Sequence, residues 1–227
     1  MDEGKEFITA KKFKEAIDVF TKALDFDYNN LEVLFYRGIS LLDFGKPQDA
    51  IKDLKRILSI KPDYKKLVYL VLSIAYKRLD KKEAALQTLS EGVYFFPTFS
   101  DVYLARAHIY LYMKQYQNAL NDFRSFNKYA SNKTELGTIT EDLWNLWVYF
   151  SPNAQTAGLI GEGDALKKLG KFDKATECYS KIVEDETIRQ ESRILHSTAV
   201  ERRALNYFHC RSFSKALVDF ETISNLP

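Results

Sequence analysis

The sequence predicts an all-α fold: a right-handed α-solenoid of helix–turn–helix repeats. Three observations predict it. A pattern of an aromatic residue, an alanine and a large apolar residue recurs along the chain. Apolar residues between these patterns lie three and four residues apart, as on one face of a helix. The chain has only 9 glycines and 5 prolines, which is few for a β protein that turns about every ten residues.

Composition narrows the function classes. With 227 residues, 46% of them hydrophobic, the chain can form one sizeable core or one elongated array. Lys+Arg 33 against Asp+Glu 31 gives a net charge of +2, which argues against holding nucleic acid or an anionic membrane by bulk charge. No stretch approaches the roughly 20 apolar residues of a membrane span. The residues after Met1 do not resemble a secretory signal, so we expect a cytoplasmic protein.

The repeat is clearest at its alanines. Four copies have the full pattern, and two weaker copies at Ala50 and Ala85 lack the leading aromatic residue. The full copies are Phe13–Ala16–Phe20, Tyr116–Ala119–Phe123, Phe172–Ala175–Tyr179 and Phe213–Ala216–Phe220. Consecutive alanines are 34, 35, 34, 56 and 41 residues apart, so a 34-residue unit persists with two insertions.

Each unit is expected to contain two helices. A small residue recurs twelve positions before each alanine, where two antiparallel helices about 8–10 Å apart need room to cross. These residues are Gly4, Gly38, Ser73, Ala107, Gly163 and Ala204. Short turns such as 44–47 and 169–172 join the helices, and Pro62 and Pro97 end second helices.

These residues resemble the tetratricopeptide repeat family, whose unit is a helix–turn–helix of 34 residues. The resemblance covers six units, 1–30, 31–64, 66–99, 100–133, 156–189 and 197–227. Other positions that carry its motif are Phe7, Ala23, Gly45, Tyr69, Tyr76, Tyr103, Tyr110, Gly170 and Tyr207. Leu41 and Leu166 replace an aromatic residue of the family, and Tyr28 replaces a proline.

The predicted organisation has three parts: repeats 1–4 over 1–133, an inserted aromatic-rich helical segment over 134–155, and repeats 5–6 over 156–227. The seven extra residues near 190–196 contain no helix breaker. We therefore predict that the first helix of the last repeat is extended, from about Thr187 to His209, with a separate kinked segment as the alternative.

The inserted segment carries both tryptophans of the chain, Trp144 and Trp147, within the run 143–150. Thr140, followed by two acidic residues, is typical of a helix start. A short helix with apolar residues on most of its circumference needs another surface to cover them. Three interpretations stay open: a wedge between repeats four and five, a built-in ligand in the concave groove, and an anchor for a partner protein.

The resemblance implies that first helices line a concave groove that binds a peptide or an amphipathic helix. Its middle is apolar and its far end is charged. Carried over position by position, the groove residues are Phe35, Ile39, Leu42, Leu70, Ile74, Lys77, Arg78, Leu104, His108, Leu111, Tyr112, Lys167 and Lys168. The resemblance thus predicts a protein-binding scaffold, a subunit of a multiprotein assembly.

Two alternatives are weaker. Family members that clamp the acidic tails of chaperones need converging Lys and Asn side chains, and the matching positions hold Met1, Lys5, Tyr36, Leu70 and Ile74. Only Lys5 fits. An RNA-binding helical repeat needs a basic stripe with interleaved aromatic residues, and the near-zero net charge weakens that alternative. We expect partners to be proteins, with no nucleic acid and no membrane.

No catalytic or metal constellation is recognisable, so we expect no enzyme activity and no cofactor. His108, His196 and His209 lack metal-ligand spacing, and Cys178 and Cys210 are expected to be small core residues in a reducing compartment. The repeat pattern begins abruptly after Met1, and no solvating helix follows Phe220. We therefore expect both ends to pack on another chain, on a second copy, or on parts of the natural protein outside this sequence. An oligomer or a larger complex is expected, with cytoskeletal and ciliary assemblies among the candidates.

Overall fold

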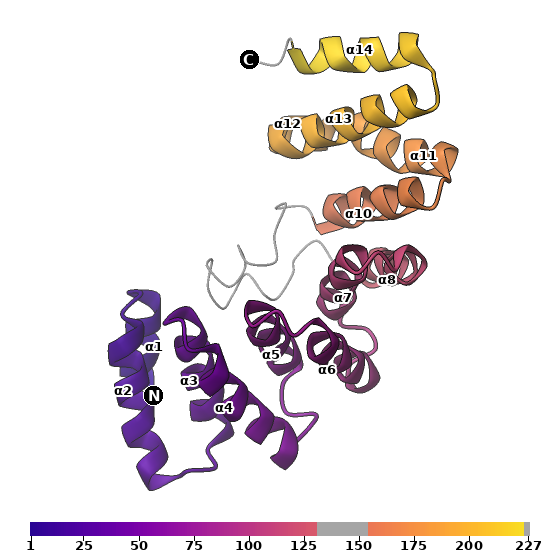
Figure 1. Ribbon diagram of the computed structural model, residues 1–227. Coiled ribbons are helices and arrows are strands. Elements are labelled where there is room, and N and C mark those ends of the chain that lie inside the picture. The colour runs from indigo at the N-terminus through magenta and orange to yellow at the C-terminus, as the bar shows by residue number, and fades with distance from the viewer. Residues whose placement is uncertain (131–153, 225–227) are drawn as a thin grey trace. The chain divides into compact units, whose positions relative to one another are not determined.

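The computed structural model describes residues 1–130 and 154–224. Those residues form 13 α-helices and, within these two ranges, no strand, which confirms the all-α prediction. Figure 1 shows the helices paired along the chain. The helices are α1 (Asp2–Thr9), α2 (Phe13–Phe26), α3 (Leu31–Asp43), α4 (Pro47–Ile60), α5 (Lys66–Arg78), α6 (Lys82–Phe95), α7 (Ser100–Tyr112), α8 (Tyr116–Tyr129), α10 (Ala154–Lys168), α11 (Phe172–Val183), α12 (Glu186–Glu191), α13 (Arg193–His209) and α14 (Phe213–Ser224). The predicted helix after Thr140, with both tryptophans, lies outside the described residues.

The described helices fall into two compact units, divided within α7. Unit 1 comprises residues 1–102, and its helices α1 to α6 each pack on the next one along the chain. Unit 2 comprises residues 103–130 and 154–224, where α8, α10, α11, α13 and α14 pack in the same sequential way. In both units the first helices of neighbouring hairpins are also in contact, α3 with α5 and α10 with α13, as expected for stacked hairpins.

The predicted crossing residues are all buried, and the reason is close approach. A Cβ added to Gly4 would lie 2.5 Å from the Phe20 ring, and one added to Gly163 would lie 2.5 Å from the Tyr179 ring. The repeating alanines on the facing helices are also buried, with at most 2% of their surface exposed. Small side chains at both positions let the two helices of a hairpin meet, which confirms the prediction.

The turn inside each hairpin has one common backbone form. The residue five positions before each repeating alanine has a positive φ, between 55° and 83°. Its own N–H and the next one donate back to carbonyls of the first helix, as in Lys11 to Ile8 at 2.9 Å and Lys12 to Phe7 at 2.8 Å. Only two of these residues are glycines. The six positions are Lys11, Gly45, Asp80, Lys114, Gly170 and Arg211.

The start of the last repeat corrects one prediction. Residues 187–209 are not one continuous helix, because α12 ends at Glu191 and α13 begins at Arg193. Ser192 between them is extended, with φ −145° and ψ 86°. Asp185 caps α12 by accepting from the Thr187 and Ile188 N–H groups. With the helix broken here, Ile188 packs in a buried apolar cluster with Ile182, Leu195 and Ala199. The separate segment is therefore the correct alternative.

The cysteines divide between core and surface. Cys178 is buried on α11, as predicted, but Cys210 is exposed at the end of α13, where the chain turns toward α14. The expectation that Cys210 belongs to the core is wrong, since a turn residue has no facing helix. Pro62 and Pro97 follow the ends of α4 and α6 by two residues, as predicted.

Candidate protein-interaction surface

The predicted groove residues of unit 1 separate by chemistry. The five apolar ones are buried, none more than 3% exposed, and they are Phe35, Ile39, Leu42, Leu70 and Ile74. Lys77 at the end of α5 is exposed. Arg78 is half-buried, donates to the Leu42 carbonyl and lies 3.6 Å from the Asp43 carboxylate. The accessible chemistry of this face is therefore polar.

The predicted groove residues of unit 2 show the same division. Leu104 is buried, and His108 lies edge-on against the Phe123 ring with centroids 5.4 Å apart. Leu111 and Lys167 are half-buried. Tyr112 and Lys168 are exposed, so these two side chains offer the most accessible surface among the predicted residues of unit 2.

A cluster of cations and aromatic rings gathers at the first helices of unit 1. Lys5 on α1 lies 4.5 Å from the centre of the Tyr36 ring on α3. Lys65, the residue just before α5, lies 5.2 Å from the Phe35 ring and 5.7 Å from the Tyr36 ring. An ammonium group over an aromatic face is attracted by the ring quadrupole. We call Lys5, Glu32, Tyr36, Tyr64 and Lys65 the Glu32 cluster.

Glu32 holds the cluster together. Tyr64 donates to its carboxylate at 2.6 Å, Lys65 also donates to it, and Lys5 lies 3.7 Å away. Burial works to raise the pKa of Glu32, but the hydrogen bonds from Lys65 and Tyr64 and the two positive charges outweigh it. The pKa of Glu32 is therefore lowered, and the carboxylate is ionised at neutral pH. The side chains of Lys5, Lys65 and Glu32 each remain about one-third exposed, so a ligand can reach them.

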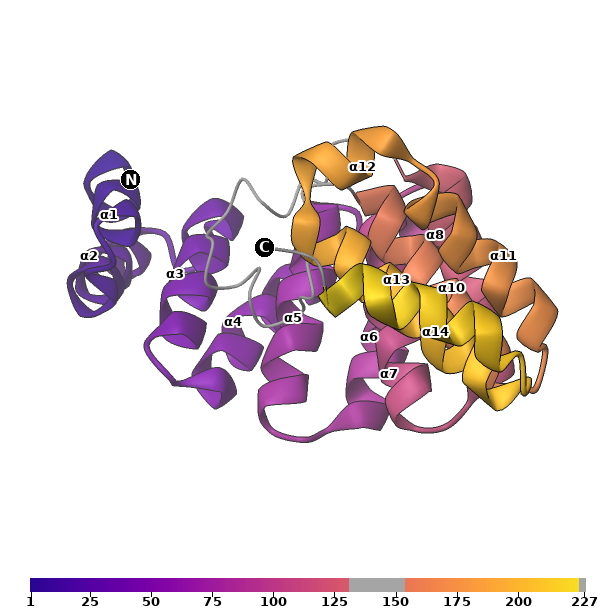
Figure 2. The same ribbon diagram turned by 90° about the horizontal axis from the view of Figure 1, so that it is seen from above.

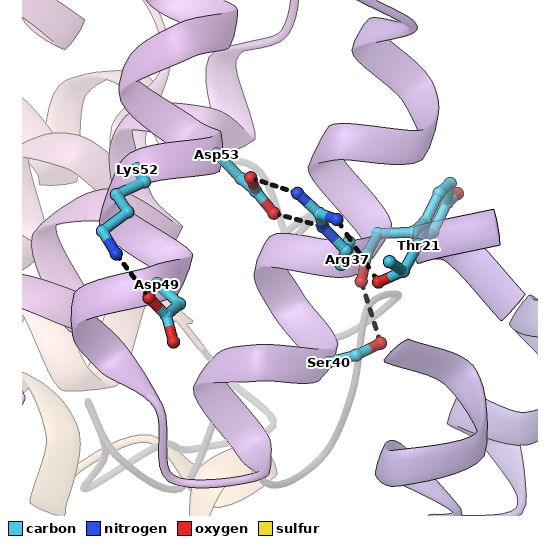
Figure 3. A network of polar contacts seen from close by, with 7 residues as sticks. Thr21, Arg37, Ser40, Asp49, Lys52 and Asp53 are labelled. Atoms are coloured by element: carbon cyan, nitrogen blue, oxygen red, sulfur yellow. Dashed lines mark hydrogen bonds and ion pairs between the residues drawn. The ribbon is translucent and has the colours of Figure 1, made fainter. Parts of the chain in front are cut away.

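A second polar network lies between α2, α3 and α4 (Figure 3). Arg37 on α3 makes two hydrogen bonds of 2.7 and 2.8 Å to the Asp53 carboxylate on α4, and a third of 3.3 Å to Thr21 on α2. The Asp53 side chain is only 8% exposed. The guanidinium thus ties its own hairpin together and also reaches the preceding one.

The same paired bond recurs in unit 2. Arg106 binds Asp122 with two bonds of 2.8 Å, and Arg203 binds Asp219 with bonds of 2.9 and 2.8 Å. Each arginine is one residue before the small crossing residue, and each aspartate is sixteen residues further on. Sequence reasoning missed this network, although the recurring Arg–Asp separation in repeats two, four and six could have revealed it.

The described residues contain no cluster of metal-ligating side chains and no candidate membrane span. Across 1–130 and 154–224, no group of three or more His, Cys, Asp or Glu side chains is placed to hold a metal ion. No helix in these ranges is long and apolar enough to cross a membrane.

Comparison with known proteins identifies the class. Models of the tetratricopeptide repeat match residues 1–65, 41–109, and 100–132 together with 159–184. The chain belongs to the tetratricopeptide repeat family. This family and its fold support a role in protein–protein interaction.

Among curated proteins, the chain is similar to the protein STIP1 homolog of Dictyostelium discoideum, with 30% identity over 97 residues. The match covers 43% of this chain and only 17% of that protein.

Several solved structures share the fold. MamA has a TM-score of 0.63 at 20% identity, with 100% of this chain and 99% of that chain covered. YrrB, described as a TPR protein with an unusual peptide-binding site, has a TM-score of 0.66 at 13% identity, with 90% of each chain covered. A thermophilic TPR protein of Thermus thermophilus, TTC0263, has a TM-score of 0.55 at 18% identity, with 88% of this chain and 96% of that chain covered. At these identities the likeness concerns the fold alone.

Proposed function

We propose that this protein is a non-catalytic scaffold of a multiprotein assembly, which binds a peptide or helix of a partner protein on the first helices of unit 1. The observation that carries the proposal is the Glu32 cluster. Two ammonium groups and two tyrosine rings, from the first two repeats and from the residue just before α5, converge there around a single carboxylate.

The cluster favours an acidic segment as the bound element. Its formal charge is positive, since Lys5 and Lys65 face only Glu32 among its members. The half-buried ring of Tyr36 flanks both ammonium groups and suits an aliphatic or aromatic side chain of the same segment. The buried groove residues beneath hold α3 and α5 in place, and Lys77 is exposed at the other end of α5 from Lys65. In unit 2, Tyr112 and Lys168 are the candidate contacts.

The test is a fluorescence-anisotropy titration with a labelled acidic octapeptide containing one leucine. We expect saturable binding that Lys5→Ala and Lys65→Ala each weaken by about tenfold, since a hydrogen bond to a charged group contributes roughly 1.5 kcal/mol. Glu32→Gln should strengthen binding, because it removes the carboxylate that competes with the ligand. The matched control is Lys52→Ala on α4, whose lysine pairs with Asp49 at 2.8 Å, and it should leave binding unchanged. Equal affinities in all these variants would contradict the proposal.

The second candidate is an adaptor for acidic chaperone tails. It is favoured by one observation: Lys5, the only residue that fits the clamp positions, belongs to the Glu32 cluster. A clamp of this kind reads the terminal carboxylate, so its affinity should fall when the same octapeptide ends in an amide. Unchanged affinity for the amidated peptide would favour the general scaffold over the chaperone adaptor.

We also propose a cytoplasmic location, and cytoskeletal or ciliary assemblies as places to look for the partner. The location is supported by the two free thiols of Cys178 and Cys210, which are typical of a reducing compartment. Trp144 and Trp147 remain proposed anchors for a partner or for the repeats themselves. Affinity capture with the wild-type chain and with Trp144→Ala/Trp147→Ala distinguishes these roles. Loss of a partner at unchanged stability indicates docking, and loss of stability indicates a structural wedge.

A further inference from the structure

One edge of unit 2 concentrates positive charge. The turns of its last two hairpins, 169–171 and 210–212, lie at the same end of α10, α11, α13 and α14, as Figure 1 and Figure 2 both show. Asn206, near the end of α13, donates to the Phe172 carbonyl at 2.8 Å, and the His209 ring stacks on the Phe172 ring with centroids 6.4 Å apart. The two segments at this edge, 167–174 and 209–215, contain six lysines and arginines but one carboxylate, that of Asp173. We call the six cations the basic edge: Lys167, Lys168, Lys171, Lys174, Arg211 and Lys215.

The charges of the basic edge are accessible and are not neutralised. Five of the six side chains are exposed, and Lys167 is half-buried. Among the described residues, none of the six forms an ion pair with a carboxylate. Cations near the hairpin turns of unit 1 do form such pairs, with Arg78 3.6 Å from Asp43 and Lys82 2.9 Å from Asp80. The basic edge therefore has charge available for a ligand.

Helix stability does not explain the lysines at the start of the second helices. The residue just before each repeating alanine lies in the first turn of the second helix, where the helix dipole favours an acidic side chain. In the first four repeats this residue is acidic or neutral, namely Glu15, Asp49, Ala84 and Asn118. In the last two repeats it is Lys174 and Lys215, both exposed. The change of sign is found in the two hairpins of the basic edge, and it favours a negatively charged ligand there.

The positive charges also crowd one another toward the first helices. Burial lowers the pKa of Lys167, and although the Asp164 carboxylate opposes this shift, the charges of Arg202 and Lys168 lower the pKa further. Asp164 is already shared between the Tyr179 hydroxyl, at 2.8 Å, and the Arg202 guanidinium, at 3.8 Å. A bound anion would relieve the repulsion between these cations.

The near-neutral charge of the whole chain conceals the basic edge. Acidic side chains gather at the other end of α11, where Glu184, Asp185 and Glu186 are all exposed. The two ends of this helix therefore differ in sign, and the net charge of +2 reports on neither of them.

We propose that the basic edge binds an acidic segment of a partner protein, a run of Asp and Glu that extends from the α10–α11 turn to the α13–α14 turn. Charge complementarity selects this occupant. The only ring in 167–174 is that of Phe172, which is half-buried and stacked on His209, so the turn with most lysines lacks the exposed rings on which single-stranded nucleic acid stacks. A planar anionic membrane contacts the outermost side chains, whereas a narrow extended segment can also reach the half-buried Lys167. The basic edge shares no residue with the Glu32 cluster, and its binding does not depend on the function proposed for that cluster.

Fluorescence anisotropy with a labelled octapeptide of alternating Asp and Glu tests this proposal. The titration uses the Lys5→Ala/Lys65→Ala chain, which lacks the lysines of the Glu32 cluster, so that the remaining binding reports on unit 2. We expect saturable binding that weakens as the salt concentration rises. Lys174→Glu should weaken it about fivefold, because the variant replaces an attraction with a repulsion, and Lys171→Glu/Lys174→Glu should weaken it more than about tenfold.

The matched control is Lys181→Glu, an exposed lysine on the same helix at the end away from the basic edge. It changes the net charge as much as Lys174→Glu does, and it should leave the affinity almost unchanged. Absence of saturable binding, or equal weakening by Lys174→Glu and Lys181→Glu, would overturn the proposal. Tighter binding of phosphatidylserine–phosphatidylcholine vesicles or of a deoxythymidine oligonucleotide than of the peptide would also overturn it. In the natural chain, a lack of effect of Lys5→Ala and Lys65→Ala contradicts only the function proposed for the Glu32 cluster.

Discussion

The α3–α4 and α10–α11 hairpins occupy the same place in the repeat, yet they are packed by different means. In α3 the single glycine, Gly38, would place an added Cβ 3.1 Å from the Leu54 side chain. In α10 three glycines approach their neighbours much more closely, with added Cβ atoms 2.0 Å from Asn127 for Gly158, 2.2 Å from Phe123 for Gly161 and 2.5 Å from Tyr179 for Gly163. A methyl group at Gly38 therefore requires only a small shift of Leu54, whereas one at any of the three α10 glycines would overlap its neighbours.

The two hairpins also differ in their polar side chains. Where α3–α4 has Arg37 and Asp53, α10–α11 has Glu162 and Cys178. Glu162 turns back to the preceding helix, accepting from Arg124 at 2.9 Å and from Asn127 at 3.0 Å. At this position of the repeat, polar bonds thus link the two helices of the first hairpin, whereas in the second they link α10 to α8, and the bond within that hairpin comes instead from the Tyr179 hydroxyl to Asp164. One repeat template therefore tolerates either arrangement, provided each buried polar group finds a partner.

The largest effect should come from a methyl group added where the helices of the α10–α11 hairpin cross. Gly163→Ala pushes a Cβ into the Tyr179 ring, which is fully buried and donates from its hydroxyl to Asp164 at 2.8 Å. We expect a loss of about 3 kcal/mol in the free energy of unfolding, measured in urea. Gly38→Ala at the equivalent position should change it by less than about 1 kcal/mol, since better helix propensity offsets a small shift of Leu54. Equal losses would remove the distinction between the hairpins.

The next largest effect should come from the Arg37–Asp53 ion pair of the α3–α4 hairpin. Asp53→Ala leaves the Arg37 guanidinium with Thr21 as its remaining described partner, so we expect a loss of about 2 kcal/mol. Cys178→Ala at the same position of α11 removes no ion pair and should cost about 1 kcal/mol for the small cavity. The double variant Arg37→Met/Asp53→Leu should recover much of the loss, because a buried pair can be replaced by packed apolar groups. If the double variant is no more stable than Asp53→Ala, packing rather than the unpaired charge explains the loss.

These two hairpins also show what a sequence can reveal. The 34-residue period identified Gly38 and Gly163 as crossing residues and the turns at Gly45 and Gly170, because backbone geometry repeats with the period. It did not reveal Gly158 and Gly161 as contacts to α8, since these residues lie beside the insertion, where the period is interrupted. In the structure Gly161 and Gly163 are both helical and buried.

The candidate site was predicted less completely than the fold. Family position correctly placed Lys5 and Tyr36 on neighbouring first helices, but it gave no reason to connect them with Glu32, Tyr64 and Lys65. Tyr64 and Lys65 lie in a turn between repeats, where the helical period carries no information about side-chain direction. The apolar groove residues were chosen by register, and register alone does not distinguish a residue that faces a ligand from one that faces the next helix.

The smallest effect is on reactivity rather than stability, and it uses Cys178 as a probe of the tighter hairpin. Burial, followed by the negative charge of Glu162, raises the pKa of Cys178 to about 11. The folded pKa exceeds the value of about 8.5 in an unfolded chain, so the neutral thiol stabilises the fold below about pH 8.5, and this contribution is lost as pH rises toward 11. With an aromatic disulfide reagent at about pH 8, we expect the exposed Cys210 to react at once and Cys178 slowly. Cys210→Ser should abolish only the fast phase, and Gly163→Ala should accelerate the slow one because it loosens the packing around Tyr179. Equally fast reaction of both thiols in the natural chain would show that the α10–α11 hairpin opens as readily as a surface turn.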